Sequence, residues 1–468
     1  MDEMQKRPLA VAAATASPPP PLVRVPVKPA DVYLEDGYRL EAVAVGLTYP
    51  AGLSFDSQGN VYIAEAGYSY GPAGTEGLGR ILRLAPDGVM HEVAKDVPGP
   101  LTGVTWHRGA LYAASGGFPG KIVRVDPDGS KQVLVDGLRS GGDHYTGKVV
   151  FDREGRMYFG VGTFTNSAVV GLDNFIFGWL PDHRYEHDVP ARTYVLRGEN
   201  YWSPDPFSLL DREPRVVQTG GFKPLGVRSY PGEVVQGNLY ANGVVYCAEA
   251  DGSKLRVVAD GMRNPFGLGF SPDGRFYALD QGYDERGSRP VVGAPDCLWE
   301  VAPGGWYGWP DYVAGIPVTD PRWVTKGAPP TAPLLAEHPP IAGRPVLELP
   351  NHSASTRFDF SLREAFGHAG EMFISQLGTG MPVTARGGGL PGFGVVRANL
   401  ETGKVTPFLV SRNPTYGGTG PQRPVDLKFD PSGEALYVLD FGTLSGNLAG
   451  IIPYALSGIL WRVTRRTA

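Results

Sequence analysis

The chain alternates apolar and polar residues in a pattern that recurs six times along its length. Each copy consists of an alternating run, a turn that usually contains glycine, and a second alternating run that ends at a polar residue or glycine. A period of two is typical of β-strands, and short turns between such runs predict hairpins. The six copies cover residues 49–67, 99–117, 143–162, 263–282, 355–378 and 422–442.

Hairpins of a second type lie between these copies. They show the same alternation, and examples begin at Gly79, Gly120, Val244 and Val395. Two hairpins per repeat give four strands, which is the size of one propeller blade. A single blade cannot bury both of its faces, so blades must stack in a ring. We therefore predict an all-β fold, a six-bladed β-propeller over residues 35–468.

One strand at each end of this region lacks a partner in its own neighbourhood. Residues 458–465 form a strand of the second-hairpin type that nothing follows, and residues 38–46 form an alternating run before the first repeat. Pairing between the two would close the ring and remove the open sheet edges. The alternative is a free edge strand, which would favour aggregation.

Three segments do not follow the repeat. Residues 164–235 and 284–350 are long, aromatic-rich and rich in Pro and Gly, and we expect them to form two loop insertions over one end of the ring. Residues 1–34 contain a short Ala-rich run and then four prolines. They are expected to be a disordered Pro/Ala-rich tail or a degenerate signal segment, and the second alternative implies a periplasmic or secreted protein.

Composition excludes several classes of function. Charged residues make up 19% of the chain, the net charge is −5, and no basic stripe indicates a nucleic-acid partner. No apolar run is long enough to predict a membrane-spanning helix. Two cysteines, Cys247 and Cys297, are too few for a disulfide framework. They form either one bridge or two free thiols.

The first candidate for chemistry precedes the third repeat. His144 stands just before an apolar strand, where a neutral imidazole can accept a hydroxyl proton near pH 7. Asp143 would orient this ring or stabilise its charge. The alternative is an ordinary turn histidine with a capping aspartate.

Two further candidates surround the fourth repeat. Arg263 and Asn264 offer donors for carboxylate or quinone oxygens, although a structural arginine that binds carbonyl groups would look the same. The carboxylates that follow are hard oxygen ligands suited to Ca²⁺, or else a solvated acidic turn. They belong to Asp280, Asp284, Glu285 and Asp296.

These motifs, in this order, resemble the soluble glucose/sorbosone dehydrogenase family of pyrroloquinoline quinone (PQQ) enzymes. The resemblance covers most of residues 35–465 and includes Gln281-Gly282 and Tyr307-Gly308-Trp309-Pro310. It implies a six-bladed, usually exported propeller that holds PQQ and Ca²⁺ over the channel. It further implies that His144 is the general base and that Arg263, Asn264 and Arg423 contact the quinone. The carbonyl groups of Gly282 and Tyr283 would bind Ca²⁺.

The chain departs from the family at four places, which indicates a variant subgroup. Tyr283 stands where the glucose enzymes commonly have proline, and Leu377 stands where the family has a quinone-binding lysine. Val425 replaces the second arginine of a late pair, and an early glutamine has no counterpart in residues 95–105. Because the carboxylates of the quinone would have fewer cationic partners, above all without the lysine, we expect weaker binding of PQQ.

The resulting expectation is a PQQ- and Ca²⁺-dependent dehydrogenase that oxidises a sugar or related alcohol. It would pass electrons to an acceptor such as a cytochrome. A Ca²⁺-dependent hydrolase or lactonase and a non-catalytic binding propeller are the alternatives, since fold alone does not determine function.

Overall fold

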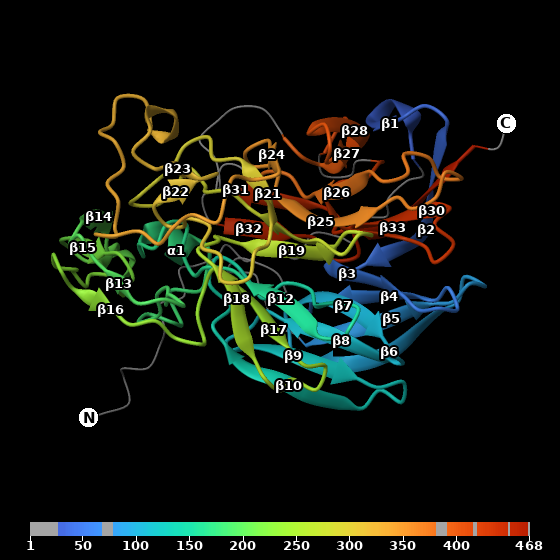
Figure 1. The fold of residues 1–468 in the computed structure, drawn as a ribbon, viewed down its shortest axis with the longest axis horizontal. Coiled ribbons are helices and arrows are strands. Elements are labelled where there is room, and N and C mark those ends of the chain that lie inside the picture. The colour runs from blue at the N-terminus through green and yellow to red at the C-terminus, as the bar shows by residue number, and fades with distance from the viewer. Residues whose placement is uncertain (1–26, 68–77, 381–390, 415–418, 448–449, 467–468) are drawn as a thin grey trace.

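The structure is a computed structural model that describes residues 27–67, 78–380, 391–414, 419–447 and 450–466 (Figure 1). Its main body is a ring of six antiparallel sheets, which confirms the predicted six-bladed β-propeller. Among the described residues, no helix is long and apolar enough to cross a membrane.

The first three blades run in chain order from the innermost to the outermost strand. Blade one contains β3 (Pro50–Phe55), β4 (Val61–Glu65), β5 (Gly79–Leu84) and β6 (Met90–Val97). Blade two contains β7 (Leu101–His107), β8 (Ala110–Ser115), β9 (Gly120–Val125) and β10 (Lys131–Leu138). Blade three contains β11 (Val150–Phe151), β12 (Met157–Val161), β17 (Val244–Ala248) and β18 (Arg256–Asp260).

The other three blades complete the ring. Blade four contains β19 (Pro265–Phe270), β20 (Phe276–Asp280), β21 (Asp296–Glu300) and β24 (Leu347–Leu349). Blade five contains β25 (Ser355–Phe360), β26 (Met372–Gln376), β27 (Gly394–Asn399), β28 (Lys404–Ser411) and β1 (Val32–Leu34). Blade six contains β29 (Pro424–Phe429), β30 (Ala435–Asp440), β33 (Gly458–Arg465) and β2 (Tyr38–Leu47).

The two ends of the propeller share blade six, as the unpartnered strands predict. Strand β2 pairs with β33 from Tyr38 opposite Arg465 to Leu47 opposite Gly458. The same strand β33 pairs on its other side with β30. The ring is therefore closed by backbone hydrogen bonds between the beginning and the end of the described chain.

The predicted boundary of the tail is wrong by several residues. Residues 29–34 are ordered: a short 3₁₀-helix (Pro29–Asp31) leads into β1, and Val32 pairs with Ser411 on the outer edge of blade five. Val32 is buried there, which explains why the segment does not behave as a solvated tail. Residues 1–26, including the Ala-rich run that suggests a signal segment, lie outside the described residues.

The second insertion is only partly a loop, which corrects the prediction for residues 284–350. It contains β21 and β24, the two outer strands of blade four, which are short and far apart in the sequence. The hairpin of β22 (Tyr312–Val313) and β23 (Ile316–Pro317) lies between them, followed by a 3₁₀-helix (Pro321–Trp323). Short strands separated by long Pro- and Gly-rich connections show too little alternation to predict.

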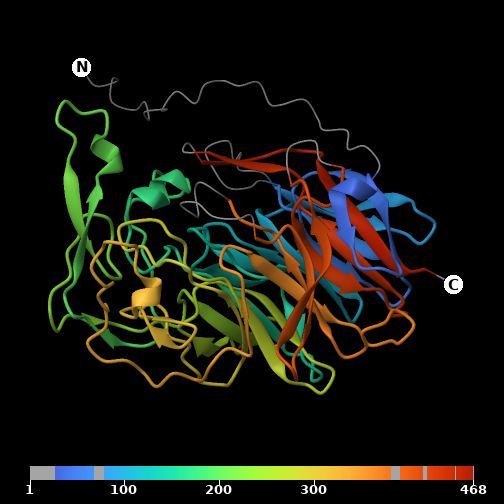
Figure 2. The same ribbon diagram turned by 90° about the horizontal axis from the view of Figure 1, so that it is seen from above.

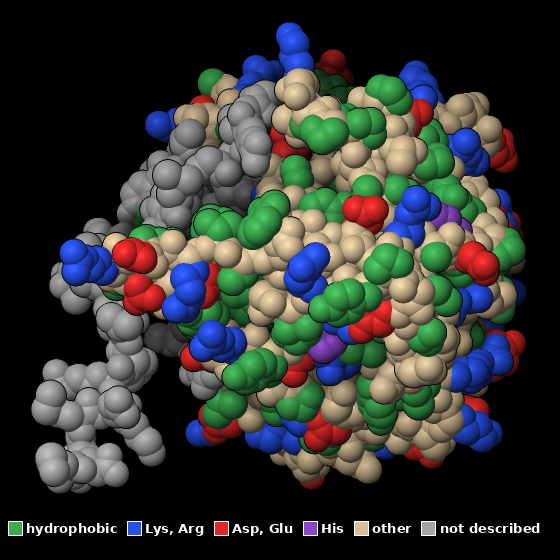
Figure 3. Space-filling model, turned by 90° about the vertical axis from the view of Figure 1, so that its left-hand side faces the viewer, with side chains coloured by type: hydrophobic (Ala, Val, Ile, Leu, Met, Phe, Trp, Pro, Cys, Tyr) green, Lys and Arg blue, Asp and Glu red, His purple; other side chains and the backbone are tan. Residues whose placement is uncertain are grey.

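The first insertion connects β12 to β17 within blade three. It contains α1 (Leu172–Ile176) and the paired strands β13 (Tyr194–Val195) with β16 (Val234–Val235) and β14 (Asn200–Pro204) with β15 (Val216–Gly220). Both insertions lie on the same side of the ring (Figure 2). On this face basic and acidic side chains are interspersed with exposed apolar ones (Figure 3). The exposed apolar side chains of the first insertion include Trp202, Leu210 and Tyr230.

Backbone hydrogen bonds show which residues before the six innermost strands are equivalent. In each blade the residue after the second strand donates its N–H group to a residue that precedes the first strand, by one position in five blades and by five positions in blade three. The six acceptors are Tyr49, Pro100, Tyr145, Asn264, Ala354 and Arg423. By the same register His144 and Arg263 are equivalent to each other on blades three and four. Radial symmetry therefore brings these side chains to the same end of the channel.

The residues three positions after the six acceptors are also equivalent to one another, and they are three charged residues and three glycines. The charged residues are Lys148, Arg357 and Asp426, and the glycines are Gly52, Gly103 and Gly267. A Cβ atom on Gly103 would lie 2.5 Å from the Cβ atom of Lys148. The glycines therefore leave the middle of the ring to the charged side chains, which close the channel at this level.

Closure by β33 predicts a large effect of Trp461, whose side chain is 1% exposed and donates its indole N–H to Asp440 at 3.2 Å. We expect Trp461→Ala to lower the free energy of unfolding by about 3–5 kcal/mol, measured by urea denaturation. Trp202→Ala is the matched control, because Trp202 is 64% exposed on the first insertion. Equal effects of both substitutions would show that closure of blade six contributes little to stability.

Candidate functional site

A cavity of about 200 Å³ opens where the innermost strands begin. Most of the site residues that the sequence predicts line it: His144, Asp143, Arg263, Asn264, Gly282 and Arg423. Tyr283 does not line it; its buried ring points to the hairpin β22–β23, where the hydroxyl group donates to the carbonyl oxygen of Tyr312 at 3.1 Å. The fold thus brings together residues that are up to 280 positions apart (423 − 143).

His144 is held in one orientation by Thr163. Its Nδ1 atom lies 2.8 Å from the carbonyl oxygen of Thr163, and the hydroxyl group of Thr163 donates to Thr165. Nδ1 therefore carries the proton, and Nε2 keeps its lone pair. Burial, together with the positive charges of Arg263 and Arg286, holds the pKa of His144 well below its ordinary value. The imidazole is neutral at pH 7 and can accept a proton.

Asp143 does not orient His144, which corrects the prediction for this residue. Among the described residues, its carboxylate accepts hydrogen bonds from Asn174 (3.0 Å) and Trp179 (2.7 Å) and forms an ion pair with Arg286 (2.7 Å). Asn174 and Trp179 belong to the first insertion. Asp143 therefore anchors that insertion against the site, and Thr163 performs the orienting role.

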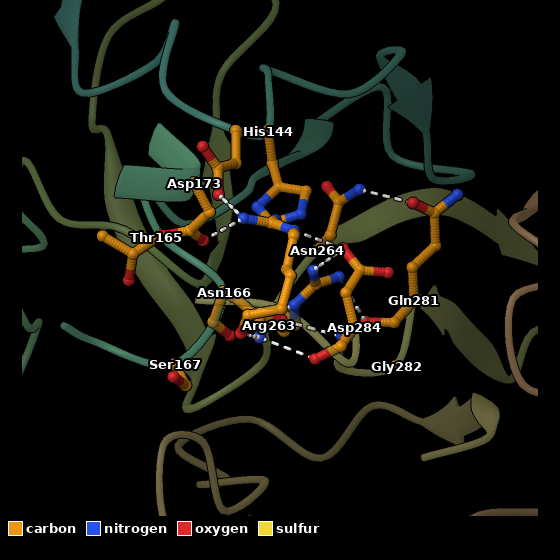
Figure 4. A network of polar contacts seen from close by, with 12 residues as sticks. His144, Thr165, Asn166, Ser167, Asp173, Arg263, Asn264, Gln281, Gly282 and Asp284 are labelled. Atoms are coloured by element: carbon orange, nitrogen blue, oxygen red, sulfur yellow. Dashed lines mark hydrogen bonds and ion pairs between the residues drawn. The ribbon is translucent and has the colours of Figure 1, made fainter. Parts of the chain in front are cut away.

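A network of buried charges surrounds Arg263 (Figure 4). Its guanidinium group forms an ion pair with Asp284 at 2.8 Å and donates to the carbonyl oxygen of Asn166 at 3.2 Å. Arg286 contacts the same Asp284 at 3.0 Å. Although burial raises the pKa of Asp284, the two arginines hold it well below its ordinary value. Asp284 is therefore ionised at any physiological pH and neutralises Arg263.

Arg286 contacts two further carboxylates, on Asp143 and Asp173. Burial raises the pKa of Asp173 to about 6 despite the charge of Arg286. Arg286 was overlooked in the sequence because its motif, Asp-Glu-Arg-Gly, indicated metal-binding carboxylates. The ion pair between Arg286 and Asp173 forms because α1 packs next to residues 284–287. No spacing of residues along the sequence predicts such a contact.

Asn264 lines the cavity and has one unsatisfied acceptor. Its Nδ2 atom donates to Gln281 Oε1 at 2.8 Å, while its Oδ1 atom is buried and has no hydrogen-bond partner among the described residues. Buried polar atoms are rarely left without a partner, so a ligand donor is expected here. A Cβ atom on Gly162 would lie 2.6 Å from this oxygen and 2.4 Å from the Cβ atom of His144. Glycine at 162 therefore keeps the two side chains together.

Arg423 faces the cavity from blade six. It donates to the carbonyl oxygens of Leu377 (3.1 Å), Gly378 (3.2 Å) and Thr379 (3.1 Å), and its guanidinium group lies over the ring of Phe393. Burial lowers its pKa to about 10. The side chain therefore fixes the segment after β26 in addition to lining the cavity.

His352 is a cavity residue that sequence analysis missed. Its Nδ1 atom lies 3.6 Å from Asp284, and its buried Nε2 atom has no hydrogen-bond partner among the described residues. Its backbone has a left-handed φ of 60°, which places the ring over the acidic loop. Burial lowers the pKa of His352, but the nearby carboxylates of Asp284 and Glu285 raise it by more, so that the pKa lies above its ordinary value.

The described residues contain no group of three or more His, Cys, Asp or Glu side chains placed to hold a metal ion. The carboxylates that the sequence indicated are already engaged: Asp296 accepts from Gly282 and Ser355, and Asp280 accepts from Arg263 and Asn264. The carbonyl groups of Gly282 and Tyr283 stay predicted Ca²⁺ ligands. They would supply two of the six to eight oxygen atoms that Ca²⁺ takes.

PQQ, which the resemblance implies, carries three carboxylates, and the cavity does not fit them. Arg263 is neutralised by Asp284, and Arg423 binds three backbone carbonyl groups. The positions of the missing lysine and arginine, Leu377 and Val425, form an apolar wall. The side chains of the cavity could therefore donate hydrogen bonds to the quinone oxygens of PQQ, but they do not provide partners for its three carboxylates.

Neither a family model nor a curated protein matches the chain, whereas many solved structures share its fold. The holo PQQ domain of pyranose dehydrogenase from Coprinopsis cinerea has a TM-score of 0.56 and 17% identity, covering 94% of this chain and 98% of that one. The apo soluble aldose sugar dehydrogenase from Escherichia coli has a TM-score of 0.52 and 15% identity, covering 92% and 100%. A carbohydrate-active enzyme of family AA12 from Trichoderma reesei has a TM-score of 0.53 and 15% identity, covering 94% and 99%.

These neighbours include oxidoreductases that are named for sugars. At such low identity they establish the fold and leave the activity open. The resemblance stated from the sequence is confirmed at the level of the fold: the chain shares the propeller architecture of these neighbours.

Proposed function

We propose that the cavity is the active site of an oxidoreductase that oxidises a sugar or related alcohol, with His144 as the proton acceptor. The observation that carries the proposal is the state of His144: Nδ1–H is fixed on Thr163 and Nε2 is a neutral acceptor in a cavity. A general base needs this combination of position and protonation state. The sugar dehydrogenases among the structural neighbours support the substrate class.

Asn264 and Arg263 would place the substrate relative to this base. A hydroxyl group that donates to the unsatisfied Oδ1 atom of Asn264 would lie close to His144, because the two side chains meet at Gly162. Arg263 is fixed by Asp284, Asn166 and the carbonyl oxygen of Gln281, so it would present its remaining donors in a defined direction. His144 takes the proton of the reacting hydroxyl group, and the oxygen can then form the carbonyl group of the product.

Oxidation of an alcohol also requires an acceptor for two electrons. The resemblance implies PQQ with Ca²⁺ for this purpose, as well as an exported protein and a downstream acceptor such as a cytochrome. A Ca²⁺-dependent hydrolase would need a cluster of metal-binding carboxylates. The carboxylates near Gly282 are instead occupied by arginines, a histidine and backbone N–H groups, so the structure offers no support for that alternative.

Replacement of the base tests the proposal. We expect His144→Ala to lower turnover by roughly 10²–10⁴-fold in a dye-linked assay over a panel of sugars and alcohols, with substrate affinity little changed. His91→Ala is the control, because His91 is exposed on blade one. In the unmodified protein kcat/KM should be constant between pH 6.5 and 8, because the pKa of His144 is lowered and the base is already neutral. Turnover that survives in His144→Ala would exclude this residue as the base.

The metal is tested separately. Because the chain supplies few free oxygen ligands near Gly282, millimolar Ca²⁺ should raise the melting temperature by less than about 2 °C relative to EDTA. The measurement is differential scanning fluorimetry, with Mg²⁺ at equal ionic strength as the control. A rise of many degrees with Ca²⁺ alone would instead support the carbonyl groups of Gly282 and Tyr283 as ligands of a resident ion.

A further inference from the structure

The cavity has two unlike halves. One half is polar and carries His144, Arg263 and Asn264 from blades three and four. The other half comes from blades two, five and six and carries Leu101, Leu377 and Val425, with Arg423 beside Leu377. Leu377 and Val425 also pack into the hydrophobic cluster of blades one and six that contains Leu53, Leu439 and Leu460. The apolar half is thus continuous with the protein core.

The charges on the polar half do not favour an anionic ligand. The cavity is lined by three carboxylates, on Asp143, Asp284 and Asp296, and by two arginines, Arg263 and Arg423. Arg263 is paired with Asp284, and Arg286 behind it is paired with Asp143, Asp173 and Asp284. A ligand with several carboxylates or phosphates would therefore place negative charge against an apolar wall and against carboxylates. Its cationic partner would be Arg423, which already donates to three backbone carbonyl groups.

The proposed oxidation nevertheless needs a two-electron acceptor next to His144. The two cysteines of the chain are buried and unpaired, and the described residues hold no metal cluster, so the described part of the chain offers no such acceptor. Nicotinamide and flavin nucleotides carry phosphate groups, which require cationic or helix-terminal partners. A compact, uncharged ring with carbonyl oxygens meets all of these conditions.

We propose that the apolar half of the cavity binds a quinone that carries no carboxylates, and that this quinone is the oxidant. The inference rests on the proposed function. The hydroxyl proton of the substrate moves to Nε2 of His144, and the C–H hydride moves to the quinone. The alcohol becomes a carbonyl compound. The quinone gains this hydride and the proton that His144 took up, and becomes a hydroquinone, so that His144 returns to its neutral form.

Binding measurements on the purified full chain test the inference with defined probes. 2,3-Dimethyl-1,4-naphthoquinone is a suitable uncharged probe, because its substituted ring cannot add to thiols. By isothermal titration calorimetry, it should bind at least about 100-fold more tightly than PQQ with Ca²⁺. The inference is overturned if PQQ binds as tightly as the naphthoquinone, or if the naphthoquinone does not bind.

A charge-restoring variant sharpens the test. Leu377→Lys combined with Val425→Arg should reverse the order of affinities, because it adds two cations to the apolar half. The matched control is Leu362→Lys with Val45→Arg, which adds the same charges at side chains that are 62% and 65% exposed. If the control variant also gains affinity for PQQ, the net charge of the protein determines the affinity, and the residues of the cavity wall do not. That result would overturn the inference. The comparison of the two probes on the unmodified chain stands even if the charged variant does not fold.

The outcome can be separated from that of the proposed function. If the naphthoquinone binds but its turnover with alcohols does not depend on His144, the quinone site stands and the proposed role of His144 falls. If PQQ alone supports a sugar oxidation that depends on His144, the proposed function stands and the carboxylate-free quinone is excluded.

Discussion

The ion pair between Lys148 and Asp426 holds the middle of the ring together. Lys148 Nζ lies 2.8 Å from Asp426 Oδ2, and the same carboxylate oxygen accepts the N–H group of Leu53 at 2.8 Å. Lys148 also donates to the carbonyl oxygen of Leu53. Blades one, three and six are thereby tied to each other at the channel axis, where burial lowers the pKa of Lys148. A buried pair of this kind defines register more than it adds stability, because both charges lose their hydration.

This constraint also defines the site. With the innermost strands locked at this level, residues three or four positions earlier must converge at the channel mouth. His144 and Arg263 are equivalent in the register, and Asn264 and Arg423 follow from neighbouring positions on their own blades. The chemistry of the cavity is therefore a consequence of strand register. A shift of one residue in a single blade would turn these side chains to the other face of the sheet.

The fold was predictable from the sequence because its signals are local, whereas the connections of the site are not. Alternation followed by a turn predicts the inner hairpin of each blade. The lack of a partner nearby in the sequence predicts the closing strand. Strands β1 and β24 have only three residues each, and a long connection separates β24 from its partner β21, so neither gives such a signal. Thr163 as the partner of His144 and Arg286 as the partner of Asp143 depend on how the first insertion and the acidic loop pack. His352 depends on a left-handed backbone. No pattern in the chain expresses these contacts.

The two halves of the cavity differ in how closely they are coupled to the fold. Leu377 and Val425 contact the same core as Leu53, so apolar residues at these positions stabilise blades one and six as well as shaping the wall. A lysine or arginine there would have to be desolvated unless an anionic ligand accompanied it. The polar half is different, because its arginines are neutralised by carboxylates of the chain itself. The arginines of the polar half therefore need no anionic cofactor to balance their charge, and the ligand that suits this half best is one that brings no charge.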